Sequence, residues 1–500
     1  MTVDPITLSV LRSALAGIAE EMGTVLVRSA YSSNIKERRD CSAALFDAAG
    51  RMIAQAEHIP VHLGAMPAAV AAVLDQTHAP GVSWILNDPF AGGTHLPDIT
   101  VVTPVFAGES DQLIGFAASR AHHADVGGRV PGSMPADSRT LAEEGVVISP
   151  RPLDEPTIDE LVARMRQPHE RRADLRAQLA ANHVGAVRLR EIAGRLEQAG
   201  GTSLREATDA VLDYSERRTR ACLAALPDGV REAEDVLEAP GGGEDLVLRL
   251  RASVEGERLV LDFAGSAAQH EGNLNCPLAV TLSACLFAVR VLTDPDIPPT
   301  AGAYRPIELR VPEGTLLNAR PGAAVAAGNV ETSSRIADLV LSAFGRAQGQ
   351  GTMNNLTLGN PDFTYYETLG GGQGACTDAD GPSGVHVAMS NTLNTPIEAL
   401  EREFPLRVIE YALRRGSGGA GAHRGGDGVV RELQALADMT FSLIGERRLH
   451  APHGAHGGDD GRPARDLLDG DPLPGKVTGT LSPGQRLRIE TPGGGGYGDA

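Results

Sequence analysis

Apolar and polar positions alternate along the chain in ways that separate helical from strand-like segments. Apolar residues recur at helical spacing from Asp4-Pro5 to about Tyr31, with one stripe running from Leu8 to Met22. Similar spacing predicts further helices over 66–74, 278–292, 330–345 and 398–413. Short apolar runs bounded by turn residues predict strands over 43–46, 52–56, 82–86, 99–106, 113–121, 246–254, 258–263, 429–444 and 487–490.

The stretch from about Thr157 to Ala225 has a different composition. Apolar residues recur at helical spacing among many Arg, Glu and Gln residues, which predicts helices over 160–166, 171–198 and 203–226. We interpret these helices as an extended arm that is solvated or contacts a partner subunit, without a catalytic role.

Strand-rich segments on both sides of the arm predict a multidomain protein of the α+β or mixed α/β class. Five hundred residues are too many for one small core. We expect an N-terminal α/β domain with a candidate metal site over 1–155, a helical arm over 156–226, a central α/β domain over 227–430 and a C-terminal β-rich segment over 431–500.

Composition narrows the classes of partner and compartment. The formal charge of −19 and the 4% aromatic content argue against binding to nucleic acid or to an anionic membrane surface. The five cysteines form no C-x-x-C pair, which is typical of reduced thiols in a cytoplasmic protein. No signal peptide is apparent at the N-terminus, and no uncharged apolar run reaches membrane-spanning length.

Two H-x-x-D tetrads stand at the two ends of one predicted hairpin. The first is His95-Leu96-Pro97-Asp98, and the second is His122-His123-Ala124-Asp125, which is followed by two glycines. The hairpin strands lie between the tetrads and are joined by a polar turn. Folding of the hairpin therefore brings histidines and carboxylates to one end.

Paired residue numbers in an antiparallel hairpin have a constant sum. A turn centred between residues 109 and 110 sets that sum at about 219, which predicts Asp98 opposite Ala121 and His95 opposite Ala124.

Mixed histidine and carboxylate ligands suit Zn, Mn, Fe or Co, so the tetrads are a candidate divalent transition-metal site. Pro97 excludes an ordinary helix interior, and the first tetrad is therefore expected to be a loop that can curl around an ion. His122 and His123 point to opposite faces of a continuing strand, so only one of them faces His95. The alternative is that the tetrads are turn-capping aspartates and surface histidines.

Three more residues are candidates for the same site. Asp40 closes the charged stretch 36–40 just before a predicted strand, where it could supply another carboxylate ligand or simply belong to a helix-end charge cluster. His58 and His62 could act as general acids or bases, although a single histidine is more often structural.

The glycine-rich segments do not predict a nucleotide site. Residues 470–477 almost match the phosphate-binding pattern, but Pro472 and Pro474 remove two backbone N–H donors and Val477 lacks the hydroxyl that would hold magnesium. The glycine runs at 416–428 and 492–498 are expected to form tight turns. The chain has no G-x-S-x-G serine motif.

Several long motifs resemble the hydantoinase B/oxoprolinase family over nearly the whole chain. The resemblance rests on residues 87–98, 121–128, 35–42, 61–66, 394–398, 417–421 and 492–497. Members include the B-type subunits of ATP-dependent N-methylhydantoinases, the C-terminal half of 5-oxoprolinases, related lactamases, and subunits of acetone and acetophenone carboxylases.

The resemblance implies a division of labour between two subunits. A separate A-type subunit would bind ATP and Mg and phosphorylate a carbonyl or amide oxygen, while the B-type subunit carries a metal. The implied ligands are His95, Asp98 and His122, joined by Asp40, with His122 preferred over His123. His123 or Asp125 would have a catalytic role in relaying protons or in orienting the ligand histidine.

The expected function is therefore that of a metal-dependent B-type subunit in a cytoplasmic hetero-oligomer. The complex would open a ring C–N bond of a cyclic amide or imide after ATP activation by the A-type partner. One alternative is a subunit of an ATP-dependent ketone carboxylase. Another is a non-enzymatic scaffold in which the tetrads are only structural.

Overall fold

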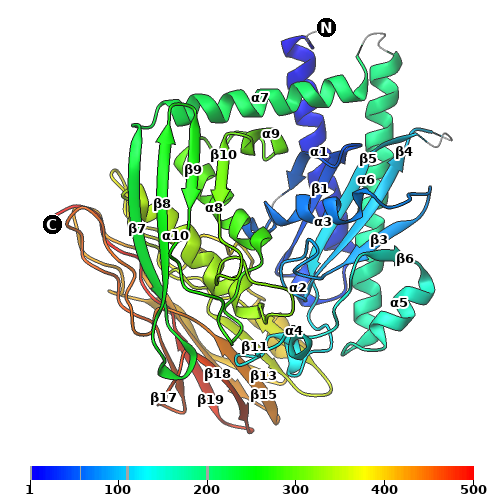
Figure 1. Cartoon of the computed structure of the whole chain (residues 1–500). Helices are drawn as coiled ribbons and strands as arrows, with labels where there is room; N and C mark the ends of the chain where they lie inside the picture. The colour runs from blue at the N-terminus through cyan, green and yellow to red at the C-terminus, as the bar shows by residue number, and fades with distance from the viewer. Residues whose placement is uncertain (1–2, 57, 109–111, 199–201, 500) are drawn as a thin grey trace.

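The computed structural model describes residues 3–56, 58–108, 112–198 and 202–499. Within these residues, four sheets are combined with helices that pack between and around them (Figure 1). The predicted mixed α/β, multidomain class is confirmed.

The first sheet is six-stranded and antiparallel, in the order β2-β1-β5-β4-β3-β6. Successive residues of β1 face opposite sides. Ala43 and Leu45 pack with α1 and α6, whereas Ala44 and Phe46 pack with α3. The elements are β1 (Cys41–Asp47), β2 (Met52–Ala56), β3 (Ser83–Leu86), β4 (Asp98–Phe106), β5 (Leu113–His122), β6 (Arg151–Leu153), α1 (Pro5–Ser29), α3 (Ala65–Leu74) and α6 (Pro168–Gln198).

The predicted arm consists of α5 (Glu155–Val162), α6 and α7 (Leu204–Ala224). The expectation of a solvated arm is wrong for one face of α6, which packs on the first sheet. Gln178 and Asn182 are buried there, and their side-chain amides donate to the backbone carbonyls of Ile99 and Val101. These polar side chains are therefore part of the core, which the charge pattern alone did not indicate.

The second sheet has the order β10-β9-β8-β7, and α7 runs from the first sheet toward it (Figure 1). The predicted hairpin is confirmed as β8 and β9, and the predicted helix 278–292 as α8. The helix predicted over 330–345 begins as a π-helical turn, Gly328–Thr332, and continues as α10. The bounds are β7 (Gly229–Leu237), β8 (Leu246–Glu255), β9 (Arg258–Asp262), β10 (Ile307–Arg310), α8 (Leu278–Leu292), α9 (Ala301–Tyr304) and α10 (Ser333–Ala343).

The last third of the chain forms two further sheets, β12-β11-β15-β18 and β13-β14-β19-β16-β17. The prediction of one helix over 398–413 is wrong. Helix α11 (Ile397–Glu403) ends before Pro405, which cannot continue a helix, and the β-branched and aromatic residues that follow form β13 (Leu406–Arg414). The other strands are β11 (Asn355–Gly359), β12 (Thr364–Glu367), β14 (Gly428–Ala435), β15 (Met439–Ile444), β16 (Arg465–Leu468), β17 (Asp471–Leu473), β18 (Lys476–Leu481) and β19 (Arg486–Glu490).

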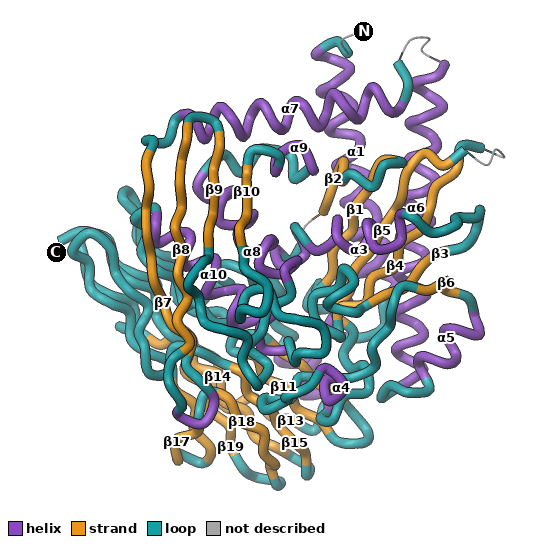
Figure 2. The backbone as a smooth tube through the Cα atoms, viewed as in Figure 1, coloured by secondary structure: helices purple, strands orange, loops and turns teal. Residues whose placement is uncertain are grey.

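The glycine runs are not mainly tight turns, as the sequence predicted. They are loop segments packed side by side near the C-terminus, where Figure 2 shows them in teal. The amide of Gly419 donates to the carbonyl of Gly494, and the amide of Gly494 donates to the carbonyl of Gly426. A Cβ on Gly494 would clash with the Gln373 carbonyl oxygen, so the segments can approach this closely only without side chains.

Short elements complete the described chain. They are α2 (Ser33–Lys36), α4 (Leu141–Glu144) and the 3₁₀ turns Pro60–His62, Pro131–Ser133 and Pro240–Gly242. The five cysteines are free thiols. Among the described helices, none is both long enough and apolar enough to cross a membrane.

Candidate metal centre

The β4–β5 hairpin brings the tetrads together, with a register one residue away from the prediction. Asp98 pairs with His122 rather than with Ala121. The reason is a register shift between Val105 and Phe106, near the far end of the hairpin. The centre of the predicted turn, between residues 109 and 110, lies outside the described residues.

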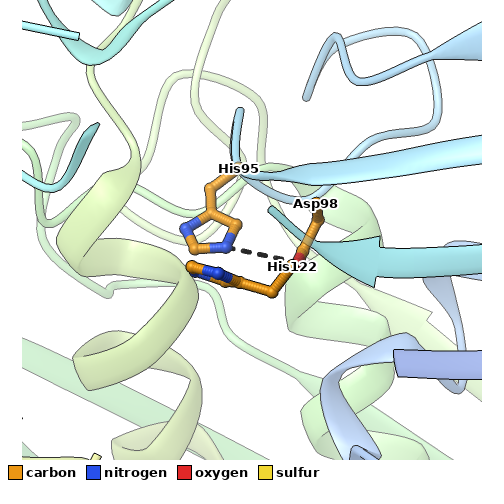
Figure 3. Close-up of side chains that lie close together, drawn as sticks. All are labelled: His95, Asp98 and His122. Atoms are coloured by element: carbon orange, nitrogen blue, oxygen red, sulfur yellow. Dashed lines mark ion pairs between the residues drawn. The ribbon is translucent and has the colours of Figure 1, made fainter. Parts of the chain in front are cut away.

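Three side chains from the tetrads converge at this end of the hairpin, as Figure 3 shows. His95 Nε2 lies 3.4 Å from Asp98 Oδ2, and the rings of His95 and His122 are 5.0 Å apart between centroids. Potential ligand atoms of His95, Asp98 and His122 all lie within 4.8 Å of one another. All three residues are at most 2% exposed.

The triad has donor atoms that fit a metal ion. Both ring nitrogens of His95 and Nε2 of His122 are buried without a hydrogen-bond partner. Leaving such atoms unpaired is costly, and a bound cation would use their lone pairs. The cavity beside them measures about 20 Å³, which is enough for a single water or ion.

Burial and neighbouring charge set the ionisation of these groups. Burial alone would raise the pKa of Asp98, but His95 and His62 hold it well below its ordinary value. Burial and the adjacent His95 lower the pKa of His122 well below its ordinary value. The site therefore combines an ionised carboxylate with a neutral imidazole, which are the protonation states that bind divalent metals.

Asp40 lies in the wall of the same cavity, but outside the group of closely spaced ligand atoms formed by the triad. Its backbone carbonyl accepts a hydrogen bond from the amide of His122 at 3.0 Å. Burial raises the pKa of its carboxyl group to about 7, with Arg38 opposing this effect and Asp98 adding to it. The structure thus brings Asp40 to the site from outside the hairpin.

Of the two single histidines, the fold brings only His62 to the triad. Its Nε2 lies 3.5 Å from Asp98 Oδ2, and its Nδ1 lies 2.9 Å from Ser42 Oγ. Thr94 Oγ1 donates to the same carboxylate oxygen at 2.5 Å. His58 is instead partly exposed, with Nε2 4.0 Å from Glu20.

His122 has two supporting residues that the sequence did not reveal. Asn34 places its side-chain amide 3.1 Å from His122 Nδ1, and the Tyr366 ring stacks on the imidazole at 4.5 Å between centroids. Arg38 covers the tyrosine ring at 4.8 Å. Asn34 adjoins the charged stretch that drew attention to Asp40, whereas no local pattern connects Tyr366 with a residue so distant in the chain.

The structure does not bring His123 and Asp125 into the triad. His123 points away from it, with Nε2 3.0 Å from Gln178 Oε1 on α6, as expected for consecutive residues of a strand. Asp125 accepts hydrogen bonds from the amides of Gly127 and Gly132 and from the guanidinium of Arg166. Asp125 therefore anchors the loop that follows the second tetrad.

The near match to a phosphate-binding loop forms the turns and strands around β17. Lys476 is buried and donates to Glu446 Oε1 at 2.5 Å and to the Glu238 carbonyl at 2.8 Å. Its ammonium group is thus used within the protein, in agreement with the sequence interpretation.

A family model supplies the assignment. The model described as Hydantoinase B/oxoprolinase matches residues 4–500. The chain belongs to this family.

Relatives within the family differ in length. A 5-oxoprolinase of Arabidopsis thaliana is 39% identical over 99% of the chain, which spans only 42% of that protein. A Pseudomonas protein, whose name proposes that it is one of the subunits of a D-/L-hydantoinase, is 30% identical, and the match covers 99% of the chain and 90% of that protein. The hydantoinase B/oxoprolinase unit thus occurs both inside longer proteins and as most of a shorter one.

Solved structures share the architecture. The ATP-dependent caprolactamase of Pseudomonas jessenii superimposes with a TM-score of 0.91 at 29% identity, covering 100% of this chain and 92% of that one. A nucleotide-free acetone carboxylase gives a TM-score of 0.85 at 20% identity, covering 99% and 76%. The second likeness shows the fold alone.

Proposed function

We propose that the chain is the metal-dependent B-type subunit of an ATP-dependent hydrolase that opens cyclic amides or imides. The observation that carries the proposal is the buried His95, Asp98 and His122 triad, whose unpaired imidazole nitrogens face one cavity. Membership of the Hydantoinase B/oxoprolinase family, and the likeness to a protein described as an ATP-dependent caprolactamase, support the cyclic amide as substrate class.

His95, Asp98 and His122 would hold the ion, with Asp40 as a fourth ligand from the cavity wall. A divalent Zn, Mn, Fe or Co ion bound there would act as a Lewis acid and lower the pKa of water. Thr94 and His62 donate to Asp98, while Asn34 and Tyr366 fix the plane of His122. Such contacts fix the orientation of ligands and are part of a metal site.

For His123 and Asp125 we propose support of the site rather than proton transfer. His123 ties β5 to α6 through Gln178, and Asp125 holds the following loop and Arg166. ATP and Mg would be bound by an A-type partner, which transfers a phosphoryl group to the amide oxygen. The complex would then be a hetero-oligomer, and cytoplasmic if the cysteine usage is a guide.

The proposed reaction needs ATP because an unstrained lactam barely favours hydrolysis. Once the amide oxygen carries phosphate, one water adds to the carbon and the C–N bond breaks, giving an amine and an acyl phosphate. A second water then releases phosphate and leaves a carboxylate. The small cavity would accommodate the reacting carbon and the attacking water rather than a whole nucleotide.

The test is co-expression of the chain with an A-type subunit, followed by metal analysis and an ATP-consumption assay. Substrates would be hydantoin, 5-oxoproline and caprolactam, with acetone and bicarbonate in parallel. We expect about one transition-metal ion per chain and ring opening that depends on ATP. His95→Ala should lose both, whereas His58→Ala should retain both. A complex without metal, or activity only toward ketones, would contradict the proposal.

A further inference from the structure

A serine and a histidine outside the metal triad form a hydrogen-bonded pair beside its cavity. Ser390 lines the same cavity as His95, Asp98 and His122 and is 5% exposed. Its Oγ lies 2.6 Å from Nδ1 of His386. Neither residue belongs to a motif that predicted chemistry, because both lie in the loop between β12 and α11.

Several contacts fix the position of this loop. Val385 exchanges backbone hydrogen bonds with Gly371, and Leu393 donates its amide to the carbonyl of Arg38. Between His386 and Ser390, Ala388 has a left-handed φ of 53°, which is rare for a residue with a side chain. This reversal brings the serine hydroxyl back against the imidazole and into the cavity wall.

The imidazole is in a neutral form that can hold the serine. Burial lowers the pKa of His386 to about 4, and Arg38 lowers it further. Nε2 is buried without a partner, so the ring makes its hydrogen bond through Nδ1. With the proton on Nδ1, His386 donates to Ser390 Oγ and leaves the serine hydrogen free to point into the cavity.

We propose that Ser390 is a further catalytic residue, positioned by His386, which protonates the ring nitrogen as the C–N bond breaks. This inference rests on the proposed function. Addition of water gives a tetrahedral carbon that carries hydroxyl, phosphate and the ring nitrogen. Ser390 donates its proton to that nitrogen and takes one from the new hydroxyl. The C–N electron pair passes to nitrogen, and the carbon becomes an acyl phosphate.

The experiment uses the complete complex and the variants Ser390→Ala and Ser390→Thr, with Ser383→Ala as control. Ser383 is an exposed serine on the same loop. We expect Ser390→Ala to lower kcat for caprolactam by about 100-fold, the usual size of general-acid catalysis, with little change in KM. Ser390→Thr should restore most of the rate because it keeps the hydroxyl. Metal content and melting temperature should remain as in the wild type.

Two comparisons separate a proton donor from a structural residue. The ring nitrogen next to two carbonyl groups in hydantoin leaves more easily than a lactam nitrogen, so the loss for Ser390→Ala should be smaller with hydantoin. His386→Leu should lower kcat, and His386→Asn, which keeps a donor near the Nδ1 position, should recover it. Equal losses on both substrates, or a rate for Ser390→Ala equal to that of the wild type, would overturn this inference alone. A wild-type complex that binds metal but opens no ring would overturn the proposed function and this inference with it.

Discussion

At the scale of single residues, the candidate site depends on side chains that hold other side chains. His122 is fixed by Asn34 at its Nδ1 edge and by Tyr366 on its face. Asp98 receives Thr94 and His62 on one oxygen, which leaves its other oxygen available. The ligand types could be predicted from the tetrads, because histidine and carboxylate are recognisable anywhere. The supporting residues are common types with no local signature.

We predict that Asn34→Ala lowers the affinity for metal by about 10–100-fold, the usual effect of losing a partner of a ligand histidine. The reason is that the ring of His122 would lose its contact at Nδ1. Competition with a chelator measures the affinity. Asn391→Ala, which removes an exposed asparagine whose amide donates to the His58 carbonyl, is the matched control. Equal affinities in the two variants would show that Asn34 does not position the ligand.

At the scale of elements, local patterns predicted most helices and strands but not how they pack. Helix α6 looked solvated because its sequence is rich in charge, yet it buries Gln178 and Asn182 on the first sheet. Strand β13 was predicted as a helix because its apolar spacing continued that of α11, and Pro405 decided otherwise. The glycine segments were predicted as turns because glycine spacing does not record close contacts with distant backbone.

We predict that Gly494→Ala destabilises the protein by about 1–3 kcal/mol or more, the cost of overpacking. The added Cβ would clash with the Gln373 carbonyl, and backbone must shift to admit it. Gly194→Ala is the control, since nothing lies within 4 Å of that Cβ on α6. In a helix this change should be neutral or stabilising by up to about 1 kcal/mol. Thermal unfolding compares them, and similar melting temperatures would contradict the close-packed arrangement.

At the scale of the whole molecule, the metal cavity is built from segments far apart in the chain. Arg38, near the first sheet, donates to the carbonyl of Tyr366 and to the hydroxyls of Thr368 and Thr392. The π-helical turn before α10 contributes Asn329 and Val330 to the cavity wall. The site therefore forms only when the N-terminal and C-terminal parts of the chain are folded against each other.

Glu331, on the same π-helical turn, gives a pH-dependent contribution to stability. One carboxyl oxygen accepts from the Met353 amide, and the other is buried without a partner. Burial raises the pKa in the folded state to about 7 from an ordinary 4.5. The folded state therefore keeps the proton that the unfolded chain releases, and this contribution is full below about pH 4.5 and is lost as the pH rises through about 7.

We predict that Glu331→Gln, which keeps the shape without the charge, removes this dependence. Relative to the variant, the wild type should lose about 3 kcal/mol of unfolding free energy between pH 4.5 and pH 8. Denaturant unfolding of both proteins across this range measures the difference. A constant difference would mean that Glu331 is ionised throughout in the folded state.

The sequence by itself determined the ligand types, the hairpin that joins the two tetrads and the family. Each of these depends on neighbouring residues or on a continuous motif. Only the tertiary structure decided the register, because one shift near the far end of the hairpin moved every pair. It also decided that His62 joins the triad, that His123 and Asp125 face away, and that Tyr366 and Ser390 adjoin the cavity. Contacts between distant residues follow from packing, which leaves no periodic trace in the local sequence.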